Sequence, residues 1–545
     1  MELGQARTIP DILAIRARRE PSGFYFDLYD EPMTYGALWA LSRRYAAGLA
    51  RAGVERGDHV AIVLPTCKEF FATFFGVMAL GAVPVPLYPT FGPAELASIF
   101  GHAEPRAAVT ISWFEAAVRQ AQASAPSLTR ILEPDELDRP AEEPPWPSLT
   151  GDETAFLQYT SGSTGHPKGV DLPHRSLLAN IRAFVEAVQV RPGEPVVSWL
   201  PLYHDMGLIG LGLGTLYAGC PLHLLAPDLR NPRQWLELVT RTRATITASP
   251  DFGYRNCLRN VHDVSGLDLT SLRIAFTGAE PIRPDTVARF EERFGLKDVL
   301  VPAYGLAEAT LAVALGDLGA PIRVDRSGRF VGVGRPIPGV EVGIWEETGN
   351  GRGRRLPAGE AGEIVVQTPA AMRGYYRDPA ATTQAFRSGW LHTGDLGYLE
   401  PDGYLFVVGR QKDLIVVRGE NVMPLDVEAV VDAVPGVRYS AAVGLGSDRL
   451  GTQRLVVVAE VRNPAAPPAE ASALVRGIVR AVHRIRGFRP SRVLLVRPGA
   501  IPKTTSGKIQ HGRLAAVVAD DELGESLLYP RRGGARGGTE SDADG

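Results

Sequence analysis

The stretch Thr160-Ser-Gly-Ser-Thr-Gly-His-Pro-Lys-Gly169 contains three glycines, four hydroxyl side chains and one lysine. A loop of this composition can surround phosphates with backbone N–H groups, hydroxyls and a single cation. It is not a P-loop of the Walker type, because Lys168 is followed by Gly169 and not by serine or threonine. A plain surface turn is the alternative, since glycines also mark turns. We predict a mobile phosphate-binding loop.

Length and composition describe an ordinary globular protein. The chain has 545 residues, which favours about three or four structural units, and 45% of its residues are hydrophobic. A net charge of −3 gives no basic field for nucleic acid, so no nucleic-acid partner is expected. The scattered cysteines Cys67, Cys220 and Cys257 favour buried thiols in a reducing cytoplasm over a zinc site or a disulfide framework, and a catalytic cysteine is the less favoured alternative.

Two apolar stretches could be mistaken for membrane spans. Phe70–Pro89 has no charged residue, but Gly81, Pro84 and Pro86 interrupt it, so we predict a helix followed by a short strand. Met206–Leu222 contains five glycines and begins beside His204 and Asp205. It predicts a buried helix near a site. No membrane span is expected.

Helix and strand patterns alternate over most of the chain, which predicts an α/β fold with a largely parallel sheet. Predicted helices are 38–52, 68–80, 113–121 and 174–188, and predicted strands are 59–64, 82–87, 107–112, 155–159, 196–199, 244–248, 274–276 and 299–301. Short alternating runs (340–345, 362–367 and 404–408) predict a β-rich subdomain over about 331–408.

The alternation returns after residue 413. We predict strands at 414–417, 437–444, 453–461 and 491–496 and helices at 424–433 and 470–485. This gives a large N-terminal domain of layered α/β subdomains (1–408), a hinge (409–412) and a small mobile C-terminal α/β domain (413–530), with the site between the two domains. The tail 531–545, rich in Gly, Arg, Asp and Ser, is expected to be disordered.

Six further motifs follow the glycine-rich stretch in order. They are Trp199-Leu-Pro-Leu-Tyr-His-Asp-Met-Gly207, Thr277-Gly-Ala-Glu-Pro281, Tyr304-Gly-Leu-Ala-Glu308, Thr393-Gly-Asp395, Gly409-Arg-Gln-Lys-Asp413 and Pro502-Lys-Thr-Thr-Ser-Gly-Lys508. Over about residues 20–529 the chain resembles the adenylate-forming superfamily of acyl-CoA synthetases, peptide-synthetase adenylation domains and luciferases. The amino-acid sequences of several motifs, such as FLQYTSGSTG (156–165) and YGLAEATL (304–311), resemble those of the fatty acyl-AMP ligase branch.

One feature departs from that branch. Fatty acyl-AMP ligases typically carry an insertion after the motif that ends here at Glu308, whereas Glu308 to Gly334 is as short as in ordinary CoA ligases. The insertion is thought to hinder thioester formation with CoA. The resemblance therefore leaves the phosphopantetheine of an acyl carrier protein and CoA open as thiol acceptors.

The resemblance implies a two-step reaction. A carboxylic acid, expected to be a fatty acid, attacks ATP to give an acyl-adenylate and pyrophosphate, and a thiol then takes the acyl group. Such phosphoryl chemistry needs positioning and charge neutralisation more than covalent help. ATP and Mg²⁺ are the implied cofactors, with Glu308 and Thr160 as implied metal ligands, because Mg²⁺ prefers hard oxygen donors.

The resemblance also assigns the nucleotide-binding side chains. The loop would hold the phosphates, Tyr304 would flank the adenine, Gly278 and Ala279 would approach its edge, and Asp395 and Arg410 would bind the ribose. Core tyrosines, turn residues and surface carboxylates are the plainer alternatives. The implied nucleotide-binding residues are Thr160, Ser161, Gly162, Ser163, Thr164, Gly165, Lys168, Gly278, Ala279, Glu280, Tyr304, Gly305, Asp395 and Arg410.

The resemblance also implies two catalytic residues besides Glu308 and one hinge residue. Lys508 would neutralise charge on the carboxylate and the α-phosphate during adenylation. His204 would orient the substrate or line the thiol path, with a structural histidine as the alternative, and Asp205 has no assigned role. Lys412 would serve as the hinge residue.

Two other functions are less favoured. A nucleotide-binding regulator without turnover is a remote alternative, because the implied catalytic residues are all present. A dinucleotide-dependent oxidoreductase is set aside because no G-x-G-x-x-G follows a strand.

Overall fold

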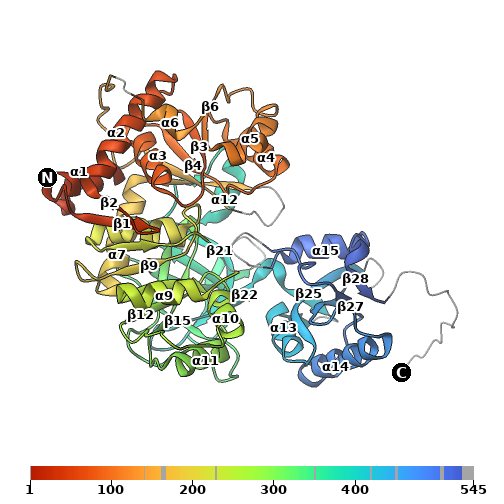
Figure 1. Ribbon diagram of the computed structural model, residues 1–545. Helices are drawn as coiled ribbons and strands as arrows, with labels where there is room; N and C mark the ends of the chain where they lie inside the picture. Colours follow the sequence, from red (N-terminus) through yellow and green to blue (C-terminus); the bar gives the residue numbers. More distant parts are fainter. Residues whose placement is uncertain are drawn as a thin grey trace. The chain divides into compact units, whose positions relative to one another are not determined.

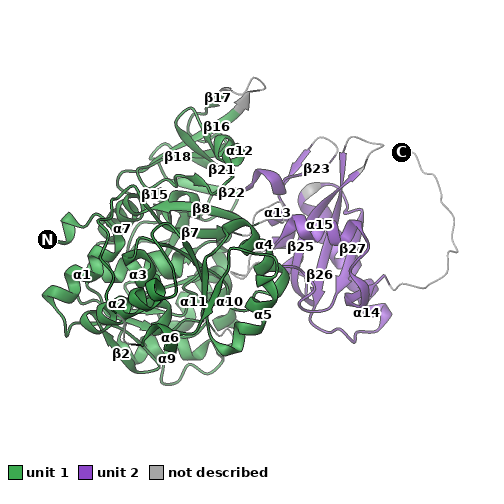
Figure 2. Ribbon diagram, turned by 90° about the horizontal axis from the view of Figure 1, so that it is seen from above, with its two compact units in different colours: residues 1–408 green, residues 409–545 purple. Residues whose placement is uncertain are grey.

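The computed structural model describes residues 2–139, 142–160, 167–227, 230–348, 352–417, 420–447, 452–503 and 509–530 (Figure 1). The chain separates into two compact units, residues 1–408 and 409–545 (Figure 2). Both units combine helices with sheets, so the predicted α/β class is confirmed. The predicted disordered tail, 531–545, lies outside the described residues.

The first layer of unit 1 is a parallel sheet in the order β4-β3-β5-β6. Helix α3 packs against α2, and its phenylalanines Phe70, Phe71, Phe74 and Phe75 are fully buried. A helical segment without charged residues is stable in a protein interior when other side chains cover its whole surface. The elements are α2 (Tyr35–Arg51), β3 (His59–Val63), α3 (Lys68–Ala79), β4 (Val83–Pro86), α4 (Pro93–Ala103), β5 (Ala107–Thr110), α5 (Ser112–Gln122) and β6 (Arg130–Leu132).

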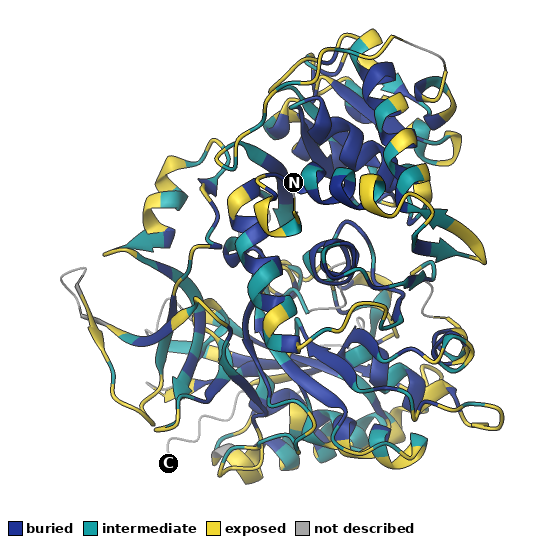
Figure 3. Ribbon diagram, turned by 90° about the vertical axis from the view of Figure 1, so that its left-hand side faces the viewer, coloured by how far each residue is buried: buried dark blue, intermediate teal, exposed yellow. Residues whose placement is uncertain are grey.

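A long mixed sheet forms the centre of unit 1. Its parallel part runs β13-β12-β11-β9-β10-β1, and β2 adds an antiparallel edge. Strands β11 and β12 are buried at every residue, as expected where helices cover both faces of a parallel sheet. Figure 3 shows buried segments in the interior of the protein and exposed residues on the outer helices and loops. The strands are β1 (Phe24–Leu28), β2 (Glu31–Thr34), β9 (Val196–Ser198), β10 (Leu222–Leu224), β11 (Ile246–Pro250), β12 (Ile274–Gly278) and β13 (Leu300–Gly305).

Helices complete this layer. They are α1 (Ile9–Arg19), α7 (His174–Val188), α9 (Arg233–Thr242), α10 (Asp251–Asn260) and α11 (Pro284–Phe294), whereas the short helix α6 (Pro134–Leu137) packs against α2 of the first layer. The predicted buried helix within 206–222 is a π-helix, η2 (Met206–Leu213), continued by α8 (Gly214–Ala218). Helices α1, α4, α9, α10 and α11 were not predicted; α9 and α11 are amphipathic, so their periodicity could have revealed them.

No strand was predicted between the glycine-rich stretch and helix α7, but the structure has one there. Strand β8 (Lys168–Pro173) intervenes and pairs antiparallel with β7 (Thr154–Thr160), so the stretch joins two strands of a hairpin. A third strand, β19 (Gly374–Tyr375), pairs with β8. The sequence concealed β8 because its residues alternate poorly and include Gly169 and Pro173.

The later part of unit 1 is antiparallel, in the order β17-β16-β18-β21-β22-β15-β14. Its elements are η3 (Ala307–Ala309), β14 (Ala312–Leu315), β15 (Gly332–Pro336), β16 (Glu341–Thr348), β17 (Arg352–Arg355), β18 (Gly362–Gln367), α12 (Pro379–Ala385), β20 (Phe386–Arg387), β21 (Trp390–Leu399) and β22 (Leu405–Arg410). The boundary between the units falls inside β22.

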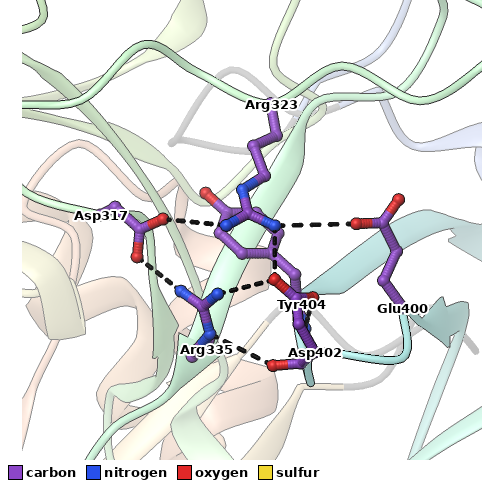
Figure 4. Close-up of polar contacts among 6 residues, drawn as sticks. All are labelled: Asp317, Arg323, Arg335, Glu400, Asp402 and Tyr404. Atoms are coloured by element: carbon purple, nitrogen blue, oxygen red, sulfur yellow. Dashed lines mark hydrogen bonds and ion pairs between the residues drawn. The ribbon is translucent and has the colours of Figure 1, made fainter.

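The connection from Glu308 to Gly334 is short and fastened at the surface (Figure 4). Arg335 bridges Asp317 and Asp402, with nitrogen–oxygen distances of 2.7 Å to each. Arg323 also pairs with Asp402 at 2.7 Å and lies over the buried Tyr404 ring, its guanidinium carbon 4.1 Å from the ring centroid. The loop between β14 and β15 is thereby tied to the turn between β21 and β22.

Unit 2 contains a four-stranded sheet in the order β25-β26-β27-β28 and a β23–β24 hairpin. Its elements are η4 (Gln411–Asp413), β23 (Ile415–Val417), β24 (Glu420–Val422), α13 (Pro424–Asp432), β25 (Val437–Ser447), β26 (Thr452–Val461), α14 (Pro468–Arg486), β27 (Arg492–Val496), α15 (His511–Ala519) and β28 (Leu527–Tyr529). Within the described ranges, no helix combines the length and hydrophobicity of a membrane-crossing segment.

Candidate active site

The stem of the glycine-rich stretch is the β7–β8 hairpin. Thr160, at the end of β7, pairs with Lys168, at the start of β8. The backbone N–H of Tyr376 donates to the carbonyl of Gly169 at 2.7 Å, which attaches the stem to the segment after β19. The predicted phosphate-binding residues Ser161, Gly162, Ser163, Thr164 and Gly165 lie outside the described residues.

A polar chain links the stem to the predicted metal ligand. The ammonium nitrogen of Lys168 lies 4.4 Å from the centroid of the Tyr375 ring, within the range of a cation–π contact. The Tyr375 hydroxyl donates a 2.7 Å hydrogen bond to Oε1 of Glu308, which lies in η3 just after β13. Three segments that are distant in sequence are thus joined through one tyrosine.

Tyr375 was missed by the sequence analysis. It lies in Gly374-Tyr-Tyr376, and nothing in that sequence distinguishes a site tyrosine from a core tyrosine. Its antiparallel pairing with Val170 on β8 brings it to the stem. Only strand pairing between distant segments could have identified it.

The structure also brings together two predicted nucleotide-binding residues. The Tyr304 hydroxyl, from β13, donates to Oδ2 of Asp395 on β21 at 2.7 Å, and the two positions are 91 residues apart. Both side chains are buried. Tyr304 and Glu308 lie where the chain leaves the carboxyl end of the parallel part of the sheet, which is where ligands bind in open α/β sheets.

Glu363 on β18 supports the turn that carries Asp395. Its Oε1 accepts a hydrogen bond from the backbone N–H of Gly394 at 3.1 Å, and its Oε2 lies 2.7 Å from Nδ1 of His392. Burial opposes ionisation of Glu363, but the bond from His392, the Gly394 N–H and the nearby Arg387 outweigh it, so the pKa of this carboxyl lies below its usual value. An ionised Glu363 therefore holds the Thr393-Gly-Asp395 turn.

Strand packing accounts for two of the predicted nucleotide-binding glycines. A Cβ at Gly278 would lie 2.5 Å from the carbonyl oxygen of Ala303, and one at Gly305 would lie 1.7 Å from that of Leu311. Ala279, which follows β12, has a positive φ of 60°, uncommon for alanine. Glu280 accepts the backbone N–H of Phe252 at 2.5 Å, at the start of α10. These residues shape the carboxyl ends of β12 and β13.

His204 lies between β9 and the π-helix. Its ring centroid is 5.2 Å from that of Tyr203, which in turn contacts Tyr88 at 4.7 Å. Burial, with the neighbouring Tyr88, raises the pKa of Tyr203 well above its usual value, so the phenol stays protonated. Asp205 accepts the backbone N–H of Met206 at 2.7 Å and so caps the first turn of η2. π-Helical turns occur often at functional sites.

The remaining predicted residues belong to unit 2. Arg410 ends β22 and Lys412 lies in η4, and both are exposed. Lys508 lies outside the described residues. On either side of it, Lys503 and Ile509 form an antiparallel bridge, and the ammonium of Lys503 lies 3.5 Å from the centroid of the Tyr439 ring.

The three cysteines are free. Burial raises the pKa of Cys67 and of Cys257 to about 12 and that of Cys220 to about 11. Thiols with such pKa values are almost entirely protonated near neutral pH and are poor nucleophiles. These cysteines therefore act as small apolar side chains.

Comparison with known proteins identifies the family. The AMP-binding enzyme family matches residues 11–376. The long-chain-fatty-acid–AMP ligase FadD26 of Mycobacterium marinum is 34% identical over 94% of this chain and 97% of its own length. That alignment spans 579 residues, more than the 545 of this chain, so the relative carries residues that this chain lacks.

Two further similarities agree with this result. The medium-chain-fatty-acid–[acyl-carrier-protein] ligase JamA of Moorena producens is 32% identical over 88% of each chain. A structure from a study of fatty acyl-adenylate ligases of E. coli and L. pneumophila superposes with a TM-score of 0.87 at 29% identity, covering 96% of this chain and 99% of that one. The chain belongs to the AMP-binding enzyme family and is a ligase. Its resemblance to the adenylate-forming superfamily, and to the fatty acyl-AMP ligase branch, is confirmed.

Proposed function

We propose that this chain activates a fatty acid with ATP and passes the acyl group to the phosphopantetheine thiol of an acyl carrier protein. In the first step a carboxylate oxygen bonds to the α-phosphorus of ATP and the bond to the pyrophosphate leaving group breaks. In the second step the thiol sulfur attacks the acyl carbon, AMP leaves, and the thiol proton is released. The ligase activities named for FadD26 and JamA support both steps.

The observation that carries this proposal is the set of polar contacts in unit 1. One set of contacts runs from Lys168 through Tyr375 to Glu308. A second contact is the buried pair of Tyr304, four residues before Glu308, and Asp395. One cation, two carboxylates and two phenols suit a nucleotide. Its phosphates need a cation, and its ribose hydroxyls need a hydrogen-bond acceptor. Positioned groups of this kind can lower the barrier of phosphoryl transfer without covalent participation.

The donor set fits Mg²⁺. Glu308 supplies a carboxylate and Thr160 a hydroxyl, and no group of three or more acidic, histidine or cysteine side chains in the described part of the chain forms a ready-made metal cage. Mg²⁺ is commonly held by one or two protein oxygens together with phosphates and waters. When bound, the ion would neutralise phosphate charge. Tyr375 would keep the Glu308 carboxylate oriented.

Apolar surroundings of the π-helix support a hydrocarbon substrate. A cavity of about 20 Å³ borders it, lined by Phe184, Leu211 and Phe276 among mainly apolar side chains. The rings of Phe184 and Phe276 lie 5.5 Å apart between their centroids. The cavity has about the size of one water molecule, so a long acyl chain requires these side chains to move. Its position beside η2, whose first turn follows His204, supports placing the acyl chain there.

Transfer to CoA is the second candidate. The described connection from Glu308 to Gly334 contains strand β14 and the loop fastened by Arg323 and Arg335, with no room in sequence for an inserted subdomain. If such an insertion is what hinders CoA, this chain accepts CoA as well. The free cysteines support a reducing compartment, and we propose a cytoplasmic location for either reaction.

Product mass spectrometry separates the candidates. The purified protein receives ATP, Mg²⁺ and fatty acids of several chain lengths, with either CoA or a phosphopantetheinylated carrier protein. We expect acyl-AMP and acylated carrier protein. Acyl-CoA formed at least as fast as acylated carrier would establish the CoA ligase instead. Absence of acyl-AMP with every acid, while ATP still binds, would favour a regulator without turnover.

A further inference from the structure

His511 connects three separate segments of unit 2. It is the first residue of α15, and its Nε2 lies 2.7 Å from Oε1 of Glu428 on α13. Its Nδ1 lies 3.7 Å from Oδ2 of Asp413, the last residue of η4. The side chains of all three residues are at most 22% exposed. The imidazole therefore joins the first turn of unit 2 to a helix and to the segment after Lys508.

The surroundings of the imidazole select its protonated form. Glu428 is buried, and its Oε1 also accepts the backbone N–H of Ala442 at 3.0 Å, so this carboxylate is held in place. A cation at the first position of a helix is disfavoured by the helix dipole, and the two carboxylates offset that cost. An imidazolium donates a hydrogen bond to Glu428 and attracts Asp413 by its charge, whereas a neutral imidazole can donate to Glu428 but carries no charge to attract Asp413.

Among the residues that the structure describes, the charged groups that act on His511 are Glu428 on α13 and Asp413 and Lys412 on η4. Burial favours the neutral ring, but Glu428 and Asp413 outweigh burial and the opposing charge of Lys412. The pKa of His511 is therefore raised above its usual value. The ring loses its proton as the pH rises through that raised pKa.

We propose that His511 is a positioning residue that sets where the proposed hinge ends, by fastening Asp413 to α13 and α15. This inference rests on the proposed function and on the predicted hinge at residues 409–412. With His511 protonated, Asp413 is fastened to α13 and α15, so that bending is confined to residues before Asp413. Loss of the proton frees Asp413, lets bending extend beyond Lys412 and slows adenylation.

Four proteins test this inference: the wild type, His511→Gln, His511→Arg and the control His483→Gln, which changes an exposed histidine on α14. Adenylation is measured by pyrophosphate exchange between pH 5.5 and 9, and each rate is divided by that of His511→Arg at the same pH to cancel other titrations. We expect the wild-type ratio to fall about fivefold as the pH rises, the value typical of losing one ion-pair contact. His511→Gln should show the low ratio throughout, and His483→Gln should follow the wild type. Equal profiles for the wild type and His511→Gln would overturn the proposal.

An NMR titration of the histidine side chains provides a test that does not depend on turnover. The His511 resonance of the full chain is assigned by its absence in His511→Gln. We expect its pKa to lie above that of a free histidine and to fall in Asp413→Asn. A His511 that titrates at the ordinary value, or that is unaffected by Asp413→Asn, would overturn the connection. If the wild type forms no acyl-AMP at any pH, the proposed function fails, and this titration still decides whether His511 joins the segments.

Discussion

The hydroxyl of Tyr375 donates a 2.7 Å hydrogen bond to the carboxylate of Glu308, from a position 67 residues further along the chain. The same ring lies under the ammonium of Lys168. A side chain that contacts both a predicted metal ligand and a predicted phosphate ligand can set the distance between them. Phosphoryl transfer requires charged groups at well-defined positions, so we expect the loss of this contact to slow adenylation.

Tyr375→Phe should slow adenylation about 10- to 100-fold, because a hydrogen bond to a charged group contributes roughly 1.5–3 kcal/mol. The ring and its contact with Lys168 remain, so the apparent Kd of ATP measured without Mg²⁺ should change little, whereas the Mg²⁺ concentration for half-maximal rate should rise. Pyrophosphate exchange at varied Mg²⁺ measures the effect. Tyr376→Phe is the matched control. An unchanged Mg²⁺ dependence in Tyr375→Phe would contradict the positioning role.

Lys508→Ala should slow adenylation at least about 10²-fold, the usual loss when one preorganised donor to a developing charge is removed. Transfer of the acyl group from supplied acyl-AMP to a thiol should survive, because we propose that Lys508 acts during the attack of the carboxylate on ATP, and supplied acyl-AMP bypasses that attack. Separate assays of the two half-reactions measure the difference. Lys297→Ala, which removes an exposed lysine of unit 1, is the control. Equal loss in both half-reactions would remove Lys508 from the first step.

Lys412→Pro should impair acyl transfer far more than adenylation. Proline fixes φ near −65° and removes the backbone N–H, so it restricts rotation at a residue of η4 that we propose as the hinge. Lys412→Ala removes the charge without this restriction and should retain both rates within a few-fold. Wild-type rates of both half-reactions in the proline variant would place the hinge elsewhere.

Glu363→Gln should make the melting temperature less dependent on pH in the acidic range. Because the pKa of Glu363 is depressed in the folded protein, its contribution is present above the usual carboxyl pKa and is lost as the pH falls through the depressed folded value. Near neutral pH the wild type should therefore melt about 2–4 °C above the variant, and the difference should shrink toward acid. Calorimetry at several pH values measures it. A constant difference between the two melting temperatures would argue against an ionised Glu363.

Much of the fold could be predicted from local patterns. Helix α7 begins and ends at its predicted residues, and β18 also has its predicted bounds, because amphipathic or alternating periodicity is a local property. Strand β8 could not be predicted, since its pairing partners β7 and β19 determine it more than its own residues do. The π-helix was expected only as a helix, because hydrophobic content does not distinguish hydrogen-bonding patterns within a buried helix.

The candidate site divides in the same way. Tyr304, Glu308 and Asp395 were named from their motifs, but their contacts with one another and with other segments depend on β13, η3, β19 and β21 meeting in space. Glu363, Tyr375 and His511 belong to none of those motifs. Each is a common residue type whose role arises from what surrounds it.

The sequence by itself determined the class of this protein, because the order of seven motifs along one chain and the periodicity between them are read without three-dimensional information. Only the tertiary structure decided that Lys168 and Glu308 are joined through Tyr375, that Glu363 supports Asp395, and that His511 ties Asp413 to Glu428. The physical reason is that hydrogen bonds and ion pairs act over a few ångströms in space. Strand pairing and helix packing set those distances, and no spacing along the chain encodes them directly.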